Sequence, residues 1–84
     1  MSTLYINSMR DSRLQLLGNN IRAERMRKRL SQEALAEKIL ISKDSLLKIE
    51  NGRQTPSAFI VFDIAYALDI PIEELFKNVP KVKE

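Results

Sequence analysis

The apolar residues in the first third of the chain recur at the three- and four-residue spacing of a helix. Leu14, Leu17 and Ile21 therefore share one helix face. The pattern predicts a helix that begins at residue 11 or 12 and ends at residue 29. Residues 1–10 show no clear period, and their pattern is equally compatible with a frayed tail, a short strand or the start of a helix.

Two serines mark the starts of two further short helices. Ser31 and Ser42 each precede a polar stretch with an acidic residue close to its start, and a serine oxygen can accept hydrogen bonds from the free N–H groups of a first helical turn. The pattern predicts one helix to about Ile39 and another to residues 51–52, where Asn-Gly favours a left-handed stop. Residues 40–41 would form the tight connection, and such a pair of helices is a helix-turn-helix.

The rest of the chain predicts two more helices and no strand. One covers about residues 57–68, and Pro71 begins a fifth that ends at residue 76 or 77. We therefore expect an all-α fold with an extension of uncertain structure at 1–10, a helix-turn-helix domain at 11–77 and a tail at 78–84.

Arg25 is unusual on the first helix because it falls four residues after Ile21, on the same inward stripe. A guanidinium at a buried position requires a partner, or else the helix is misassigned. The other basic residues of this segment lie mostly on other sides of the helix and can reach solvent: Arg22, Arg27, Lys28 and Arg29.

Composition restricts the chemistry that the chain can support. It has 84 residues, two glycines, no cysteine and no histidine, which excludes the usual zinc ligand sets, thiol nucleophiles and imidazole bases. We expect no enzyme activity, no cofactor, no metal and no small-molecule ligand. The sequence also lacks a membrane-length apolar run and a secretory signal, so we expect a cytoplasmic protein with no membrane partner.

Charge is unevenly distributed along the chain. Residues 1–53 hold 11 Lys and Arg against 6 Asp and Glu, whereas residues 54–84 hold 3 against 5, within a net charge of +3. The positive half contains the predicted helix-turn-helix, and a protein that binds DNA phosphates is expected to carry its positive charge there. Taken alone, the charge is more simply explained as a solvated cationic helix face.

The segments SQEALAEKI and SKDSLLKIENG, within residues 31–52, resemble the Xre/Cro-type, lambda repressor-like helix-turn-helix family. LGNNIRAER before them and DIAYALDIPIEELF after them extend the resemblance over residues 17–76. It implies a compact five-helix domain with the helix-turn-helix in helices two and three. It also implies a bacterial or phage-type transcriptional regulator that binds double-stranded DNA sequence-specifically and acts by occupying an operator. Such a regulator acts as a repressor that blocks polymerase or as an activator that touches it.

The resemblance implies roles for particular residues, although local roles such as capping or a solvated charge explain each one separately. It pairs Arg25 with Glu50, which would resolve the burial of both charges. It assigns base reading in the major groove to one set and phosphate binding to another. The first set is Lys43, Asp44, Leu47 and Lys48, and the second is Gln32, Ser42, Asn51 and Arg53.

Two residues depart from the family pattern. Leu40 stands in the turn where glycine is usual, so the backbone is either left-handed at a cost of about 1–2 kcal/mol or reshaped by a longer second helix. Leu47 replaces a small polar residue. It would contact a thymine methyl group, cover a neighbouring residue, or indicate that base reading is lost.

The fourth predicted helix carries aromatic residues outside its core face, which consists of Val61, Ile64, Ala65 and Leu68. These aromatics suggest a covered surface, either under the N-terminal apolar residues (Leu4, Tyr5, Ile6 and Met9) or in a homodimer, which we favour because two subunits read two half-sites. The alternative function is a protein-interaction module, such as an antitoxin or adaptor, but interfaces between proteins are depleted in lysine. The aromatic residues are Phe59, Phe62 and Tyr66.

Overall fold

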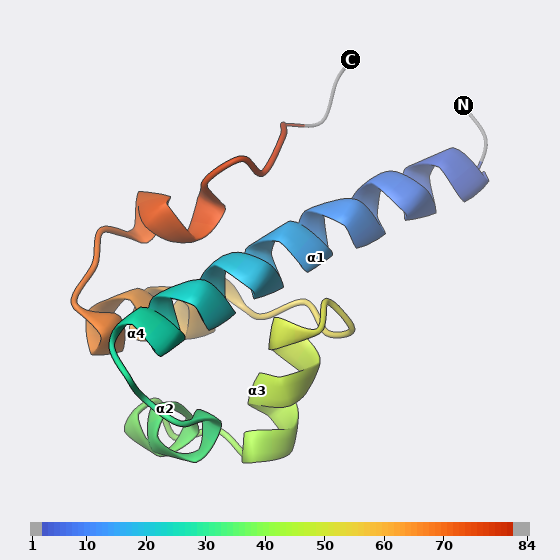
Figure 1. Cartoon of the computed structure of the whole chain (residues 1–84). Coiled ribbons are helices and arrows are strands. Elements are labelled where there is room, and N and C mark those ends of the chain that lie inside the picture. The colour runs from blue at the N-terminus through green and yellow to red at the C-terminus, as the bar shows by residue number, and fades with distance from the viewer. Residues whose placement is uncertain (1–2, 82–84) are drawn as a thin grey trace.

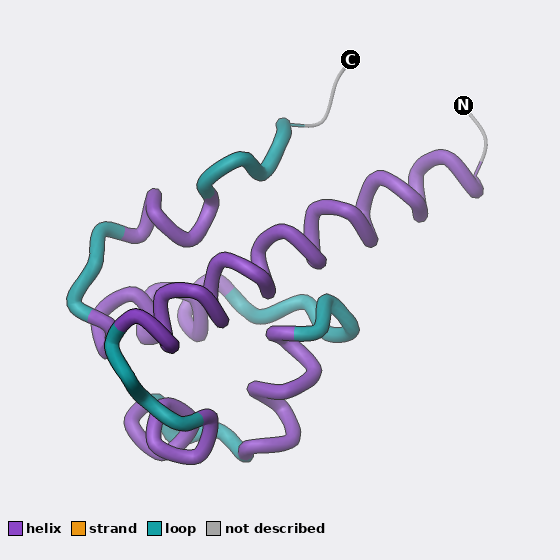
Figure 2. Tube along the Cα trace, viewed as in Figure 1, coloured by secondary structure: helices purple, strands orange, loops and turns teal. Residues whose placement is uncertain are grey.

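The computed structural model describes residues 3–81, with side chains described from Ser12 onward. Within that part the chain forms four α-helices and one short 3₁₀ helix, with no strand (Figure 2). The elements are α1 (Thr3–Arg27), α2 (Gln32–Lys38), α3 (Lys43–Glu50), α4 (Ala58–Leu68) and the 3₁₀ helix η1 (Ile72–Phe76).

The long helix α1 organises the molecule (Figure 1). It contacts α3, α4 and η1, while α2 packs against α3 and α4. The shorter helices gather along the C-terminal half of α1, and its N-terminal half projects beyond them (Figure 1). None of the described helices is both long and apolar enough to cross a membrane.

One apolar core joins all five elements. The core face expected on the fourth helix is buried, as are Leu17 and Ile21 of α1. Leu14 is only partly buried, at the edge of a groove between α1 and η1. The core consists of Leu17, Ile21, Leu35, Ala36, Ile39, Leu46, Ile49, Val61, Ile64, Ala65, Leu68 and Leu75.

Serine caps begin three of the helices. The Oγ atoms of Ser31, Ser42 and Ser57 accept hydrogen bonds, at 3.0, 3.0 and 3.1 Å respectively, from the backbone N–H three residues further on. Each cap satisfies one donor that the helix cannot satisfy itself. The predicted starts of α2, α3 and α4 are thus confirmed.

The four α-helices end in a left-handed residue with a Schellman hydrogen-bond pattern. After α2, the N–H of Leu40 donates to Glu37 O at 3.3 Å and that of Ile41 to Ala36 O at 3.0 Å. Helix α2 is therefore not extended, and the turn is left-handed at leucine. The left-handed residues are Arg29 (φ 58°), Leu40 (φ 59°), Gly52 (φ 72°) and Asp69 (φ 55°).

Leu40→Gly is expected to stabilise the domain by about 1 kcal/mol, since glycine accepts this backbone conformation without the 1–2 kcal/mol penalty but makes the unfolded chain more flexible. The Leu40 side chain is 91% exposed, so little packing is lost. Urea unfolding would measure the change. Leu40→Ala is the matched control because alanine keeps the backbone penalty, and equal stability of the two variants would contradict the prediction.

The prediction of five α-helices was wrong in its last member. Residues 72–76 form a 3₁₀ helix, in which the N–H of Glu74 donates to Pro71 O at 3.0 Å. The amide of Asn20 on α1 donates to Leu75 O and Lys77 O at 2.9 and 2.8 Å. These two carbonyl groups accept hydrogen bonds from α1 and not from backbone N–H groups of a further helical turn. The contact with Asn20 therefore accounts for the short element.

The bounds of the first helix also differ from the prediction. It begins at Thr3. Of the three possibilities for residues 1–10, a tail, a strand or the start of a helix, the described residues therefore form a helix. It ends at Arg27 because Arg29 is left-handed. Helix α1 thus crosses the boundary predicted between residues 10 and 11, and the division into domains stays a prediction.

Candidate nucleic-acid interface

Helix α3 exposes one side while it buries the other. Leu46, Ile49 and Glu50 face the interior. Residues 43, 44, 47 and 48 fall on the opposite side, and all four are exposed. The four residues expected to read bases therefore form a continuous outer face of α3, which lies at the surface next to α2 (Figure 1).

The charges on this face are paired within the chain. Lys43 Nζ lies 3.1 Å from Glu33 Oε1, and Lys48 Nζ lies 3.1 Å from Asp44 Oδ2 one turn earlier. Both pairs are exposed, and exposed pairs contribute little to stability. The lysines can therefore exchange these carboxylates for other acceptors at low cost. Sequence reasoning missed Glu33 at this face, because its partner lies in the next helix.

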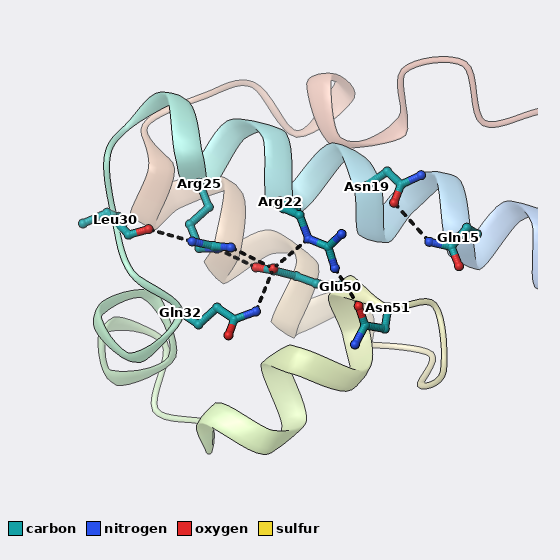
Figure 3. Close-up of polar contacts among 8 residues, drawn as sticks. All are labelled: Gln15, Asn19, Arg22, Arg25, Leu30, Gln32, Glu50 and Asn51. Atoms are coloured by element: carbon teal, nitrogen blue, oxygen red, sulfur yellow. Dashed lines mark hydrogen bonds and ion pairs between the residues drawn. The ribbon is translucent and has the colours of Figure 1, made fainter.

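Behind the face, Arg25 and Glu50 join α1 to α3 (Figure 3). Arg25 Nε donates to Glu50 Oε2 at 2.7 Å and Nη2 donates to Oε1 at 3.1 Å. The third nitrogen, Nη1, donates to Leu30 O at 2.8 Å. Glu50 is fully buried, so its charge is balanced by a two-point contact of the kind that makes such burial tolerable.

Two further side chains reach the Glu50 carboxylate (Figure 3). Gln32 Nε2 donates to Oε1 at 3.2 Å, and Arg22 Nε lies 3.5 Å from the same oxygen. Arg22 Nη2 also donates to Asn51 Oδ1 at 2.6 Å. Arg22 keeps 38% of its side-chain surface exposed, so it reaches solvent and also joins the cluster around Glu50. The sequence offered one signal for this contact. Arg22 lies three residues before Arg25, so the two side chains are neighbours on the surface of α1.

The four residues expected to bind phosphate divide into two groups. Gln32 at the start of α2 contacts Glu50, and Asn51 at the end of α3 contacts Arg22, so both belong to the cluster around Glu50 (Figure 3). Ser42 lies at the opposite end of α3, where its hydroxyl caps the helix. Arg53 follows the Schellman turn and is exposed. Together they flank α3 at both ends.

The aromatic residues of α4 lie on the surface. Phe59, Phe62 and Tyr66 are 80%, 59% and 82% exposed. The side chains of Leu4, Tyr5, Ile6 and Met9, the alternative cover, lie outside the described part of the chain. Tyr66 also lines a depression between α4 and the end of α2, together with Leu40 and the charged residues Lys38 and Asp63.

The sequence model of the Helix-turn-helix family matches residues 21–75. The chain belongs to this family, in its Xre/lambda repressor-like form. The family consists of DNA-binding transcriptional regulators. The match covers α2, α3, α4 and all of η1 except Phe76, together with the part of α1 that holds Arg22 and Arg25.

Individual members of the family are similar over most of the chain. An uncharacterized transcriptional regulator in the ATPase CF(0) region of Rhodospirillum rubrum is 37% identical over 65 residues, which are 77% of this chain and 60% of that protein. The chain thus spans less than two thirds of that relative. The uncharacterized HTH-type transcriptional regulator YazB of Bacillus subtilis is 41% identical over 61 residues, 73% of this chain and 88% of that one.

Solved structures of family members share the fold. The restriction-modification controller protein C.AhdI from Aeromonas hydrophila aligns with a TM-score of 0.73 and 35% identity, over 75% of this chain and 96% of that one. The clp gene regulator ClgR from Corynebacterium glutamicum aligns with a TM-score of 0.75 and 25% identity, over 77% and 69% of the two chains.

Proposed function

We propose that this chain is a sequence-specific regulator that binds double-stranded DNA in the cytoplasm and controls transcription by occupying an operator. The observation that carries the proposal is the exposed face of α3, with two lysines and an aspartate, on a helix-turn-helix whose other side is fixed to α1 by the Arg25–Glu50 pair. A major groove accepts such a helix and distinguishes all four base pairs. No catalytic role is part of the proposal.

In this proposal the outer face of α3 reads the bases. Lys43 and Lys48 donate to guanine O6 and N7, and Asp44 accepts from cytosine N4. The ion pairs of both lysines open or are shared when DNA binds. Leu47 is partly exposed between these polar residues, which suits contact with a thymine methyl group better than cover for a neighbouring core residue.

Phosphate binding falls to the residues that flank α3. Gln32, Asn51 and Ser42 supply uncharged donors at the helix ends, and Arg53 supplies a positive charge. Because phosphate contacts carry no base information, this set would fix the register of α3 in the groove without choosing the sequence.

Lys48→Gln and Arg53→Gln are expected to affect binding differently. Loss of Lys48 should reduce discrimination at one base pair by about 1–3 kcal/mol, whereas loss of Arg53 should weaken binding to all duplexes and lower the salt slope by about 0.9. Titration of matched and mismatched duplexes at several salt concentrations measures both. Lys77→Gln, which removes an exposed charge near η1, is the control. The same loss on every duplex for both variants would contradict the division of roles.

We further propose that the regulator works as a homodimer through the aromatic residues of α4. Three exposed aromatics on one helix form an apolar surface that a second copy would cover. Light scattering at tens of micromolar should give twice the 9.7 kDa mass of one chain, and Phe62→Lys should give the monomer mass. A monomer mass for the unsubstituted chain would contradict the dimer.

The second candidate function is a protein-interaction module, such as an antitoxin or adaptor, which the same exposed aromatics support. In that case a partner protein would cover α4. The exposed lysines of α3 favour DNA, because protein interfaces are depleted in lysine. A chain that binds no duplex from a random pool would favour the interaction module.

A further inference from the structure

The Arg22 side chain lies between Glu50 and Asn51 at the end of α3, although Arg22 belongs to α1, outside the helix-turn-helix. Its Nη2 donates to Asn51 Oδ1 at 2.6 Å, and its Nε lies 3.5 Å from Glu50 Oε1 (Figure 3). The side chain is partly buried, with 38% of its surface exposed. Its guanidinium is thus held at the end of α3 by a carboxylate and an amide together.

The contact determines which end of the Asn51 amide faces Arg22. Arginine has donors and no acceptor, so the atom of Asn51 that meets it must be the carbonyl oxygen. The amide nitrogen, with two hydrogens, then points away from Arg22. Because phosphate oxygens accept hydrogen bonds, a nitrogen that is turned away from Arg22 keeps both of its hydrogens available for a phosphate.

Charge at this end of α3 supports the same conclusion. The C-terminus of a helix carries a partial negative charge, and Glu50 adds a full one. Arg25 balances Glu50 through both carboxylate oxygens. The second guanidinium, of Arg22, makes the cluster net positive next to Asn51. Without it, this helix end would be a less favourable place for a phosphate.

We propose that Arg22 is a positioning residue for DNA binding, which holds the Asn51 amide so that Nδ2 donates to a backbone phosphate. The inference rests on the proposed DNA binding and extends it to α1. Arg22 acts through Asn51 and does not contact the phosphate itself.

A double-mutant cycle tests this proposal. Arg22→Met, Asn51→Ala and the double variant are titrated with a duplex selected by the unsubstituted protein, between 50 and 200 mM salt. Each single change should weaken binding about tenfold, as loss of one hydrogen bond to a charged group does. The double variant should be no more than about twofold weaker than Arg22→Met, because both changes remove the same contact. The salt slope should fall by clearly less than the about 0.9 expected for loss of a direct phosphate contact, since Arg22 adds charge near the phosphate without contacting it.

Controls separate positioning from folding. Lys28→Met removes one positive charge next to the end of α1, at an exposed site outside the Glu50 cluster, and it should bind as the unsubstituted protein does. Arg22→Lys keeps the charge and one donor, and should recover part of the affinity. Thermal unfolding of every variant shows whether the fold is retained, as expected while Arg25 and Gln32 still hold Glu50.

Additive losses in the cycle, or a salt slope that falls by about 0.9 in Arg22→Met, would overturn the inference and show that Arg22 binds phosphate independently. Failure of the unsubstituted protein to bind any selected duplex would instead overturn the proposed function, and the inference with it. The two failures are thus distinguishable in one set of titrations.

Discussion

Arg25→Met is expected to lower the free energy of unfolding by about 3 kcal/mol, because it leaves a fully buried carboxylate without its two-point partner. Glu50 would keep only Gln32 at 3.2 Å and the more distant Arg22 at 3.5 Å. For a domain of this size the loss corresponds to a fall in melting temperature of roughly 12 °C or more. Thermal and urea unfolding would measure it.

The matched control removes both charges. Arg25→Met combined with Glu50→Leu should recover most of the lost stability, because replacing a buried ion pair by apolar side chains is often neutral, whereas removing one partner is not. An unchanged melting temperature in Arg25→Met would contradict the importance of the pair. A double variant less stable than the single one would show that Glu50 stabilises the fold through its other contacts.

Gly18→Ala is expected to destabilise the domain by about 1–3 kcal/mol through overpacking. Gly18 lies on α1 where the end of α3 approaches it. An added Cβ would collide with the backbone oxygen of Glu50 and lie 2.6 Å from that of Ile49. These atoms belong to the backbone, so α3 itself must move. The collision outweighs the gain of up to about 1 kcal/mol that alanine brings inside a helix.

The same variant should also weaken DNA binding, because the displaced end of α3 carries Glu50 and Asn51. Ser12→Ala is the control, since it introduces alanine at an exposed position of α1 and should change stability by less than about 0.5 kcal/mol. Stability and affinity of Gly18→Ala equal to those of the unsubstituted protein would show that α1 and α3 tolerate a wider separation.

The features of the fold that depend on local chemistry could be predicted from the sequence. Serine caps and the Asn-Gly stop act within a few residues, so Ser31, Ser42 and Gly52 determined helix bounds that the structure confirms. The left-handed turn at Leu40 could not be chosen in advance, because leucine alone disfavours it. The packing of α2 and α3 into one core outweighs that local preference.

Contacts between distant segments account for the remaining differences. The 3₁₀ form of η1 is associated with Asn20, whose partners Leu75 and Lys77 lie 55 and 57 residues away. Likewise, Arg22 meets Asn51 at a separation of 29 residues. No pattern within a few residues of the sequence predicts such pairs. The resemblance to a known family supplied the Arg25–Glu50 pair, but it did not indicate that Arg22 joins the same cluster.

In vitro selection of duplexes from a random pool, followed by titration, tests the central claim most directly. The account predicts a recovered half-site and an affinity for the selected duplex at least about a thousandfold higher than for random duplexes at physiological salt. That affinity should fall steeply between 50 and 200 mM salt. Equal affinity for selected and random duplexes would contradict the claim that this chain is a sequence-specific regulator.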